Sequence, residues 1–484
     1  MEIIISKIND IVWSQAMIVL CVCTGLYFSF RTGFLQFTYL RQMLKLLFQE
    51  KTTDKGISPF QAFALAISGR VGTGNIVGVA TAIAMGGPGA IFWMWLIAIF
   101  GSASAFVEAT LGQIYKKEMN GEYRGGPAFY IEKGLGIKWY AMLFAIITAV
   151  GCGMFLPGIQ SNSIASSMSN AFGISTNTDF GVPINVMGVI IVFLLALIIF
   201  GGVKRLSKVA EMIVPIMAGA YILIGLTIIG LNFKQIPDVF SLIISSAMGQ
   251  DAVFGGILGS AISWGVKRGI YSNEAGQGST PHVAAAAAVG HPVEQGLVQA
   301  FSVYVDTLFV CSTTAFMILF TNQYNVMDEH TQTLIVENVK GIDYTAFTQS
   351  AISFHFPSFG QEFVAVALFF FAFTTIIAYY YYAETNVAYL VCAKHFKPAV
   401  FILRILFLVG IYMGSVKEAK LVWAIGDIGV GLMAWVNLIA ILGLGNVVIK
   451  VWKDYKAQKK QGVKNPVFDV EKLNIKNAEY WEKK

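Results

Sequence analysis

The chain has 484 residues, of which 56% are hydrophobic and 13% are charged, and its formal net charge is +6. A soluble domain of this size would carry roughly a quarter charged residues, and the mean hydropathy of +0.65 also excludes an ordinary soluble protein. The positive charge does not indicate nucleic-acid binding, because Lys and Arg lie in short loops and in the C-terminal segment.

Apolar runs of about 20 residues recur along the chain, each long enough to cross roughly 30 Å of hydrocarbon. They lack the period-two alternation of barrel strands, so they predict helices, whose backbone groups bond within the segment. The pattern predicts an all-α polytopic membrane protein with about 11 spans. The expected limits are 11–30, 59–84, 88–113, 138–160, 182–202, 207–231, 237–272, 293–320, 361–391, 399–414 and 419–446.

The distribution of Lys and Arg predicts the orientation of these spans. Loops on the side of residues 31–55 carry most of the basic residues, whereas the long loop 321–360 is mainly acidic. The excess of positive charge marks the cytoplasmic side, so we expect the N-terminus outside and the C-terminus inside. The first run lacks a small-residue cleavage site and is expected to be a retained helix.

The ten spans after the first divide into two sets of five that enter the membrane from opposite sides. Each set opens with a glycine-rich, interrupted span, which predicts a 5+5 inverted repeat with a binding site at the two interruptions. The expected units are a first helix with its linker (1–58), two repeats (59–231 and 237–446) and a Lys-rich cytoplasmic tail (447–484). We expect the tail to be amphipathic or disordered.

The second span contains the segment SGRVGTGN (68–75), whose glycines break a helix at membrane depth. Such a break exposes carbonyls at the end of one half-helix and N–H groups at the start of the next. Carbonyls suit a hard cation, and N–H groups suit a carboxylate. The alternative is tight helix packing by glycine, which the polar Thr73 and Asn75 at the same place disfavour.

In the seventh span, the segment LGSAISWG (258–265) places Ser263 and Trp264 between glycines and predicts the second interruption. The alternative is a long tilted helix. The polar stretch 272–281 that follows is expected to line the cytoplasmic mouth.

Two further spans carry polar groups. Thr374 and Thr375, in the ninth span, offer adjacent hydroxyls to a sodium ion, unless they bond back to their own helix. Gln160 ends the fourth span, where it either bonds a substrate or caps the helix.

Acidic residues in or near the spans are costly and mark functional sites by default. Most of them are expected to pair with Arg70, Arg268, Arg404 or loop donors. These acids are Glu108, Glu211, Asp251, Asp306, Glu384 and Asp427.

Catalytic and nucleotide-binding motifs are absent from the sequence. It contains no Gly-x-Ser-x-Gly, no His-Glu-x-x-His and no Walker sequence. The five cysteines show no metal-binding spacing. The chain is therefore not expected to be an enzyme or an ATP-driven pump, so transport through it would follow an ion gradient or be passive.

Several long blocks along nearly the whole chain resemble the alanine or glycine:cation symporters, also called the sodium:alanine symporter family. The blocks are SGRVGTGNIVGVATAIAMGGPGAIFWMW (68–95), GGPAFYIEKGLG (125–136), GVKRGIYSNEAGQGSTPH (265–282), HPVEQGLVQAFSVYVDTLFVC (291–311) and FFAFTTIIAYYYYAETN (370–386).

The resemblance implies a LeuT-type fold of the amino acid-polyamine-cation superfamily, with one helix added at the N-terminus. It also implies sodium-coupled import of small neutral amino acids, alanine and glycine, across the cytoplasmic (inner) membrane of a bacterium. Sodium is then a co-transported ion. The partners are the amino acid, sodium and the lipid bilayer, and the oligomeric state is left open.

Site residues follow from the resemblance motif by motif. The amides of Thr73 and Gly74 are implied to hold the substrate carboxylate, and the side-chain oxygen of Asn75 to hold sodium. Many members carry Trp where this chain has Tyr379. The implied substrate contacts are Thr73, Gly74, Gln160, Ser263, Trp264 and Tyr379, and the implied sodium ligands are Val71, Asn75, Thr374 and Thr375.

Other readings stay open at this point. A proton-coupled amino acid symporter uses the same architecture. A channel needs a continuous polar path, and a membrane-embedded enzyme needs a paired nucleophile and base at one depth. Two non-identical broken helices in inverted repeats favour alternating access over both.

Overall fold

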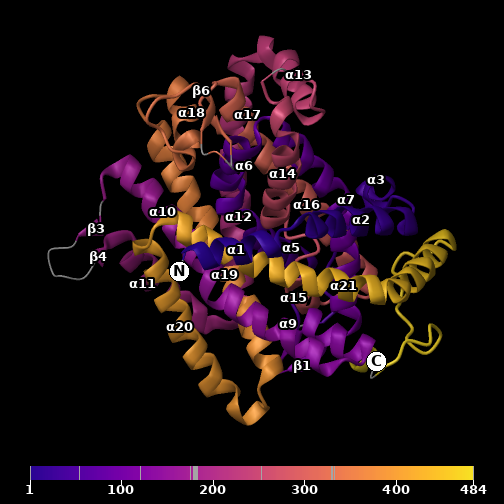
Figure 1. Ribbon diagram of the computed structural model, residues 1–484. Coiled ribbons are helices and arrows are strands. Elements are labelled where there is room, and N and C mark those ends of the chain that lie inside the picture. Colours follow the sequence, from indigo (N-terminus) through magenta and orange to yellow (C-terminus); the bar gives the residue numbers. More distant parts are fainter. Residues whose placement is uncertain are drawn as a thin grey trace.

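The computed structural model describes residues 2–53, 55–119, 121–174, 176–177, 184–251, 253–328, 331 and 333–482. Helices make up nearly all of this part of the chain, and short antiparallel two-stranded ribbons lie at its periphery (Figure 1). The ribbons pair β1 (Lys117–Met119) with β2 (Glu122–Arg124), β3 (Thr176–Asn177) with β4 (Ile184–Asn185), and β5 (Asn325–Met327) with β6 (Leu334–Glu337).

The helices fall into three groups by length and continuity. The long ones are α2 (Gln15–Thr32), α7 (Gly89–Ile114), α12 (Gly202–Leu231), α19 (Gly360–Leu390), α20 (Phe396–Val416) and α21 (Ala419–Lys460). Three apolar runs contain a π-helical segment and comprise α5 (Pro59–Arg70), η1 (Gly74–Gly78) and α6 (Val79–Gly86); α9 (Lys138–Val150), η3 (Gly151–Phe155) and α10 (Leu156–Phe172); and α16 (Pro292–Val303), η7 (Tyr304–Cys311) and α17 (Ser312–Phe320). The shorter helices are α1 (Glu2–Val12), α3 (Leu35–Thr38), α4 (Leu40–Leu47), α8 (Pro127–Tyr130), α11 (Val186–Ile198), α13 (Ile236–Ala247), α14 (Leu258–Asn273), α15 (Pro281–Ala286), α18 (Phe347–His355) and α22 (Glu479–Glu482).

A helical membrane-spanning architecture is confirmed. Within the described residues, 8 helices are long and apolar enough to cross a membrane, or up to 9 when the bent pair around η1 counts as one span. The predicted span 182–202 begins at two residues outside the described part and otherwise corresponds to α11, which has 13 residues. The predicted span 237–272 consists of the separate helices α13 and α14. The predicted number of about 11 spans therefore stays a prediction.

The predicted interruption in segment 68–75 is confirmed. Helix α5 begins with a capping box, in which Ser58 and Gln61 satisfy each other's backbone N–H groups, and with Pro59 in its first turn. It ends at Arg70, and the axis of the following run 74–86 is bent from it by 52°. The chain thus breaks where the glycines are densest.

The second interruption was predicted in segment 258–265, and this prediction is wrong because α14 is continuous through it. Gly265 packs α14 against α7, since a side chain there would meet the carbonyl oxygen of Ala90 and the Cβ of Trp93. Gly265 thus brings two helices together and does not break one, and a side chain at Gly259 would meet nothing within 4 Å. The chain leaves the helix on either side instead, before Leu258 and from Glu274 to Thr280.

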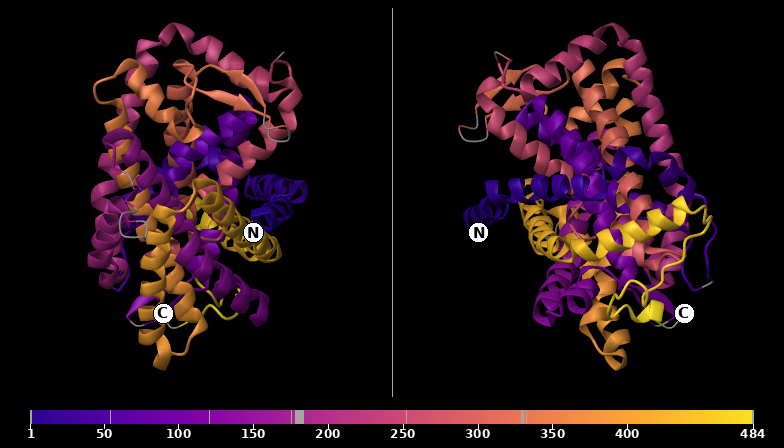
Figure 2. Two further views of the ribbon diagram at one scale, coloured as in Figure 1. Left: turned by 60° about the vertical axis from the view of Figure 1, so that its left-hand side comes forward. Right: turned by 90° about the vertical axis from the view of Figure 1, so that its right-hand side faces the viewer.

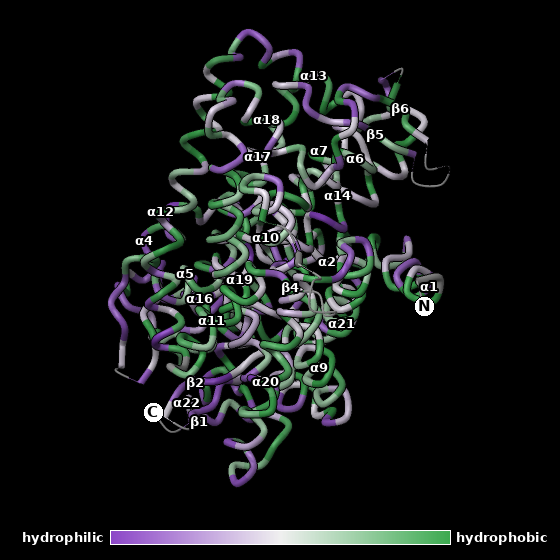
Figure 3. The backbone as a smooth tube through the Cα atoms, turned by 90° about the vertical axis from the view of Figure 1, so that its left-hand side faces the viewer, coloured by the Kyte–Doolittle hydropathy of each residue, from purple (hydrophilic) through white to green (hydrophobic). Residues whose placement is uncertain are grey.

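Burial separates central helices from lipid-facing ones. In the most apolar 18-residue stretch of residues 292–320, 78% of the residues are buried, and in that of α19 the share is 72%. In the corresponding stretches of residues 203–231 and 393–416, which correspond to α12 and α20, it is 28% and 33%. The hydrophobic residues on α12 and α20 therefore face outward, as lipid contact requires. Hydrophilic residues gather around β1, β2 and α22 (Figure 3).

The C-terminal tail is ordered against the membrane helices and is not a disordered end. Helix α21 continues to Lys460, and the following residues 463–482 form a strap that returns to the end of α7 (Figure 2). Trp481 is 6% exposed, and its Nε1 donates to the carbonyl oxygen of Gln113 at 2.9 Å. The buried ammonium of Lys116 lies 4.5 Å from the ring centre of Tyr480 and 5.3 Å from that of Trp481.

Ion pairs fix the strap to β1 and to the helical turn that follows α8. Glu479 bonds Lys133 at 2.6 Å and Lys117 at 3.2 Å. Its hydrogen bond from Lys133 lowers the pKa of Glu479 below its usual value. The strap therefore covers one face of the helix bundle with both apolar and charged contacts.

We expect Trp481→Ala to release the strap. The change removes a buried ring, its hydrogen bond and one wall around Lys116, at a cost of about 3 kcal/mol. The melting temperature of the purified protein should fall, and trypsin should cut the strap faster. Val467→Ala is the matched control, because the side chain of Val467 is 67% exposed. Equal protease resistance of the two variants would contradict the docking.

Candidate functional site

The first interruption leaves backbone N–H groups that side chains satisfy. The amide of Gly72 donates to Oδ1 of Asn75 at 2.8 Å. The amide of Thr73 donates to Oε1 of Gln160 at 3.1 Å, and the Thr73 hydroxyl bonds the same oxygen. Gln160 reaches the break from α10, and all four residues are buried. A single amide oxygen thus accepts the bonds of two donors in the broken segment.

The surroundings of the break leave no space for side chains at its glycines. A Cβ at Gly72 would collide with Oγ1 of Thr375 and would lie 3.0 Å from Oε1 of Gln160. At Gly74 it would lie 3.0 Å from the ring of Tyr271 and 3.2 Å from the backbone of α14. The break is therefore enclosed by α10, α14 and α19.

A buried carboxylate faces the break from η7. Asn75 Nδ2 donates to Oδ1 of Asp306 at 2.6 Å. Ser272 Oγ lies 3.1 and 2.9 Å from the two carboxylate oxygens, and Thr307 Oγ1 donates to Oδ2 at 2.8 Å. Sequence reasoning named Asp306 only as one of six intramembrane acids. Its π-helical setting, which turns it toward Asn75, has no signal in the sequence.

The two predicted hydroxyls on α19, those of Thr374 and Thr375, have different partners. Thr375 Oγ1 lies 2.8 Å from the carbonyl oxygen of Ser68 and 3.3 Å from that of Val71, so the structure brings Thr375 and Val71 together. The same hydroxyl also lies 3.0 Å from the carbonyl oxygen of Phe371 on its own helix. Thr374 Oγ1 bonds back to its own helix, 2.9 Å from the carbonyl oxygen of Phe370. The structure does not bring Thr374 to Val71.

The predicted substrate contacts on α14 and α19 lie in different places. Tyr379 is 2% exposed and lies within the core beside Tyr382, at a ring separation of 6.1 Å. Ser263 and Trp264 lie about two helical turns before Tyr271 on α14, roughly 10 Å along the axis. Tyr271, which is not among the predicted contacts, packs beside Gly74.

Trp264 lines a cavity of about 650 Å³ together with residues of α1, α6 and α21. Between this cavity and the break, Arg268 forms a two-pronged pair with Asp427 at 3.0 and 2.8 Å, and Lys267 adds a contact at 3.0 Å. The guanidinium lies 4.8 Å from the ring centre of Trp423 and 5.1 Å from that of Trp264. This cluster lines the cavity where α14 meets α21.

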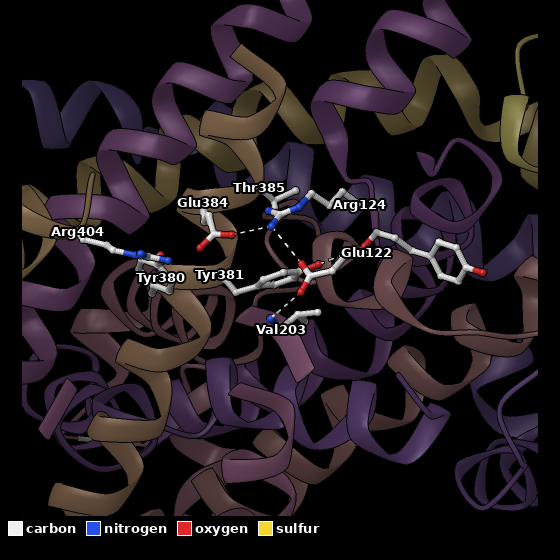
Figure 4. A network of polar contacts seen from close by, with 9 residues as sticks. Glu122, Arg124, Val203, Tyr380, Tyr381, Glu384, Thr385 and Arg404 are labelled. Carbon is white, nitrogen blue, oxygen red and sulfur yellow. Dashed lines mark hydrogen bonds and ion pairs between the residues drawn. The ribbon is translucent and has the colours of Figure 1, made fainter. Parts of the chain in front are cut away.

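On the side of the β1–β2 hairpin, Arg124 joins three parts of the chain (Figure 4). It bonds Glu384 on α19 at 2.6 Å and Glu122 on β2 at 3.1 Å, and Glu122 accepts from the amide of Val203 on α12 at 3.3 Å. Arg404 bonds the hydroxyl of Tyr380 and not Glu384. Helices α12 and α19 are thereby tied together beside the strap.

The predicted pairing of the intramembrane acids holds in part. Asp427 pairs with Arg268, as expected, whereas Glu384 pairs with Arg124. Glu211 accepts from Gln61 at 3.0 Å. Asp251 caps a turn through the amides of residues 253 and 254 at 2.9 and 3.1 Å. Glu108 accepts from backbone amides of the non-helical segment after α14.

The chemistry of the enclosed site is that of oxygen and N–H groups. Among the described residues there is no group of three or more His, Cys, Asp or Glu that could hold a metal ion. One carboxylate, side-chain amides, hydroxyls and the free carbonyls at the end of α5 are what an alkali cation takes as ligands. The amides that open η1 can receive a carboxylate.

Comparison with known proteins gives a consistent result. A family model described as the sodium:alanine symporter family matches residues 1–470. A relative from Bacillus subtilis (strain 168), whose name describes a sodium/proton-dependent alanine carrier, is 56% identical over 99% of this chain and 97% of its own length. The sodium/proton-dependent alanine carrier protein of Bacillus sp. (strain PS3) is 50% identical over 91% of this chain and 97% of its own. The sodium/alanine symporter AgcS of Methanococcus maripaludis is 37% identical over 96% of this chain and 99% of its own length.

We expect Gly72→Ala to destabilise the folded protein by about 1–3 kcal/mol, because the added methyl group overlaps Thr375 and crowds Gln160. Gly219→Ala is the matched control. A Cβ at Gly219 meets nothing within 4 Å, so its helix should be unchanged or slightly more stable. Thermal unfolding of both variants in detergent measures the difference, and equal melting temperatures would contradict the enclosed break.

Proposed function

The chain belongs to the sodium:alanine symporter family, and from that premise we propose that it imports alanine and glycine together with sodium by alternating access. The family is one of membrane transporters and not of enzymes. Its cation-dependent alanine carriers support an amino acid as substrate and a cation as co-substrate.

The observation that carries the proposal is the meeting of Asn75 and Asp306 beside the broken helix. A carboxylate with 0% exposure inside a membrane protein is costly unless a positive charge accompanies it. A sodium ion between this carboxylate and the side-chain oxygen of Asn75 would supply that charge. Asn75 Oδ1 would exchange its bond with the amide of Gly72 for the cation.

The amino acid would bind where Gln160 now accepts from Thr73. Its carboxylate offers the acceptor atoms that Oε1 of Gln160 provides in this structure, so substrate entry would turn the Gln160 side chain aside. The amides of Thr73 and Gly74 open a continuous helical run, 74–86, whose positive end favours an anion. Tyr271 and Tyr379 would bound the space for the side chain of the substrate.

A second sodium would bind at Thr375. Its hydroxyl lies 2.8 Å from the carbonyl oxygen of Ser68 and 3.3 Å from that of Val71. These carbonyls become available to a cation where α5 ends. Thr374 is the neighbouring hydroxyl of the predicted pair. In this arrangement Thr374 keeps its bond to α19, so Thr375 is the stronger candidate.

Alternating access is supported by a difference between the two sides of the broken helix, since one side has a cavity and the other is closed by a network of ion pairs. A cavity approaches the break as far as Arg268 and Asp427, whereas the hairpin network of Arg124 ties the opposite side. We propose that the cavity side is external and that the hairpin and the strap are cytoplasmic, following the excess of basic residues. The protein would lie in the cytoplasmic membrane of a bacterium, with its later ten spans as an inverted repeat.

The runner-up function is proton-coupled amino acid symport, because two relatives are named for dependence on both sodium and protons. Uptake of labelled alanine into proteoliposomes decides between the two. Sodium-driven symport requires saturable uptake under an imposed sodium gradient. Uptake that follows an imposed pH gradient in the absence of sodium would make the proton-coupled function the correct one.

We expect Asn75→Ala to raise the sodium concentration for half-maximal alanine uptake by roughly ten- to a hundred-fold, the equivalent of losing one buried polar partner at about 1–3 kcal/mol. Alanine affinity at fixed sodium should fall as well, because the two sites are linked. Asn446→Ala, on the exposed face of α21, is the control with unchanged sodium dependence. The same sodium dependence in both variants would remove Asn75 from the cation site.

Substrate size gives a further prediction. In the proposed site the ring of Tyr271 lies directly beside Gly74, so each poorly fitting methylene of the substrate should cost about 1–3 kcal/mol. Glycine and alanine should inhibit labelled alanine uptake well below the concentrations at which leucine does. Inhibition by leucine as strong as that by glycine would contradict the small site.

A further inference from the structure

Two helices of the interior end at oppositely charged residues. Helix α5 ends at Arg70, and α14 ends at Asn273, with Glu274 as its C-cap in the left-handed conformation at a φ of 54°. Arg70 is 2% exposed and Glu274 is 0% exposed. Both interrupted segments therefore carry an ionisable side chain into the protein interior at the point where the helix stops.

The carboxylate of Glu274 has few partners. Its Oε2 lies 3.4 Å from the hydroxyl of Thr280 and 3.4 Å from that of Tyr382. Its Oε1 is buried without a hydrogen-bond partner. Arg70 reaches the same Thr280 hydroxyl at 3.0 Å, so Thr280 links the cation to the acid. A hydroxyl can donate to a carboxylate or accept from a carboxylic acid, so both neighbours tolerate either protonation state.

Two other buried acids that share Arg70 as a neighbouring cation, Glu108 and Asp306, differ in this respect. Glu108 accepts from the amides of Gly276 and Gly278 at 3.3 and 3.1 Å and from Asn437 at 2.7 Å. Asp306 accepts from the Asn75 amide at 2.6 Å. N–H groups can only donate, and both oxygens of Glu108 accept from them, so protonating Glu108 would set donor against donor. At Asp306 one oxygen accepts from the N–H group of Asn75, and the other faces the hydroxyls of Ser272 and Thr307. Glu274 is the member of this group for which the structure shows only hydroxyl partners, so it can take a proton without disturbing an N–H group.

The helix dipole also favours the protonated form of Glu274. A C-terminal helix end carries partial negative charge, which stabilises the cation of Arg70 at the end of α5. The same effect at the end of α14 disfavours a carboxylate on Glu274 and favours its neutral form. Glu108, Glu274 and Asp306 share Arg70 as their neighbouring cation, so together they leave an excess of negative charge. A proton on Glu274 and a cation at Asp306 would offset this excess.

We propose that Glu274 is a proton-binding site, which takes up a proton from the outer water and releases it to the inner water in each transport cycle. The proposal rests on the proposed function, since the cycle is what exposes the site to each side in turn. The proton is carried with the amino acid and in addition to sodium, and it leaves Glu274 as the carboxylate beside Arg70.

Groups facing Glu274 come from every element around it. Arg70 supplies positive charge from α5, and the hydroxyls and thiol are neutral in the physiological range. The facing groups are Arg70, Cys152, Tyr271, Asp306, Tyr379 and Tyr382. His282 is near Tyr382 but is not the carrier, because burial lowers the pKa of its imidazole to about 4 and its two nitrogens face Ser279 and Asn386.

The test measures sodium-driven alanine uptake into proteoliposomes at a series of pH values, together with the internal pH reported by a trapped dye. In the wild-type protein, uptake should fall by up to about tenfold per pH unit above the pKa of the site, and alanine entry should acidify the interior. Glu274→Gln, an isosteric neutral side chain, should take up alanine with a flat pH profile and no acidification. Glu337→Gln, which changes an exposed acid on β6, should keep the wild-type pH profile.

Each outcome decides the matter. A pH profile in Glu274→Gln equal to that of the wild type would overturn the proposal, and so would wild-type alanine entry without acidification, even if the variant failed to fold. Absence of any sodium-dependent uptake by the wild type would instead refute the proposed function. Acidification that is present in the wild type and lost in Glu274→Gln establishes the site.

Discussion

Every part of this molecule depends on satisfying backbone groups where a helix is interrupted inside the membrane. Lipid offers no hydrogen bonds, so each N–H and C=O that a break releases needs a partner from another helix. Asn75 and Gln160 serve the first break, and Glu108 serves the segment that follows α14. These bonds hold α7, α10 and α14 around the break, and the packing of the bundle follows from them.

The same constraint explains why the interrupted segments are suited to transport. A backbone group that a side chain satisfies can also be satisfied by a ligand, at little net cost, when the side chain swings away. Gln160 is such a replaceable partner for Thr73. Groups held by other backbone, as in the continuous α14, are not replaceable in this way. Exchange between protein and ligand partners is thus confined to the few residues around each break.

The sequence predicted those features of the fold that neighbouring residues determine by themselves, such as the break in the second predicted span. The glycines of segment 68–75 break a helix wherever it lies, and the bend is found there. The glycines around Trp264 looked equivalent, but Gly265 is small because α7 packs against it, which only the folded structure reveals. The same limit applies to the site. Val71 and Thr375 were paired through the family motif, whereas Tyr271 and the turn of Asp306 toward Asn75 depend on packing between distant segments.

The strap also sets an order in which contacts can form as the chain is made. Trp481 bonds a residue 368 positions earlier in the chain, so this contact cannot form until all the residues between them have been synthesised. A chain whose synthesis stops shortly after α21 would carry every membrane helix, correctly inserted, and still leave the aromatic enclosure of Lys116 open.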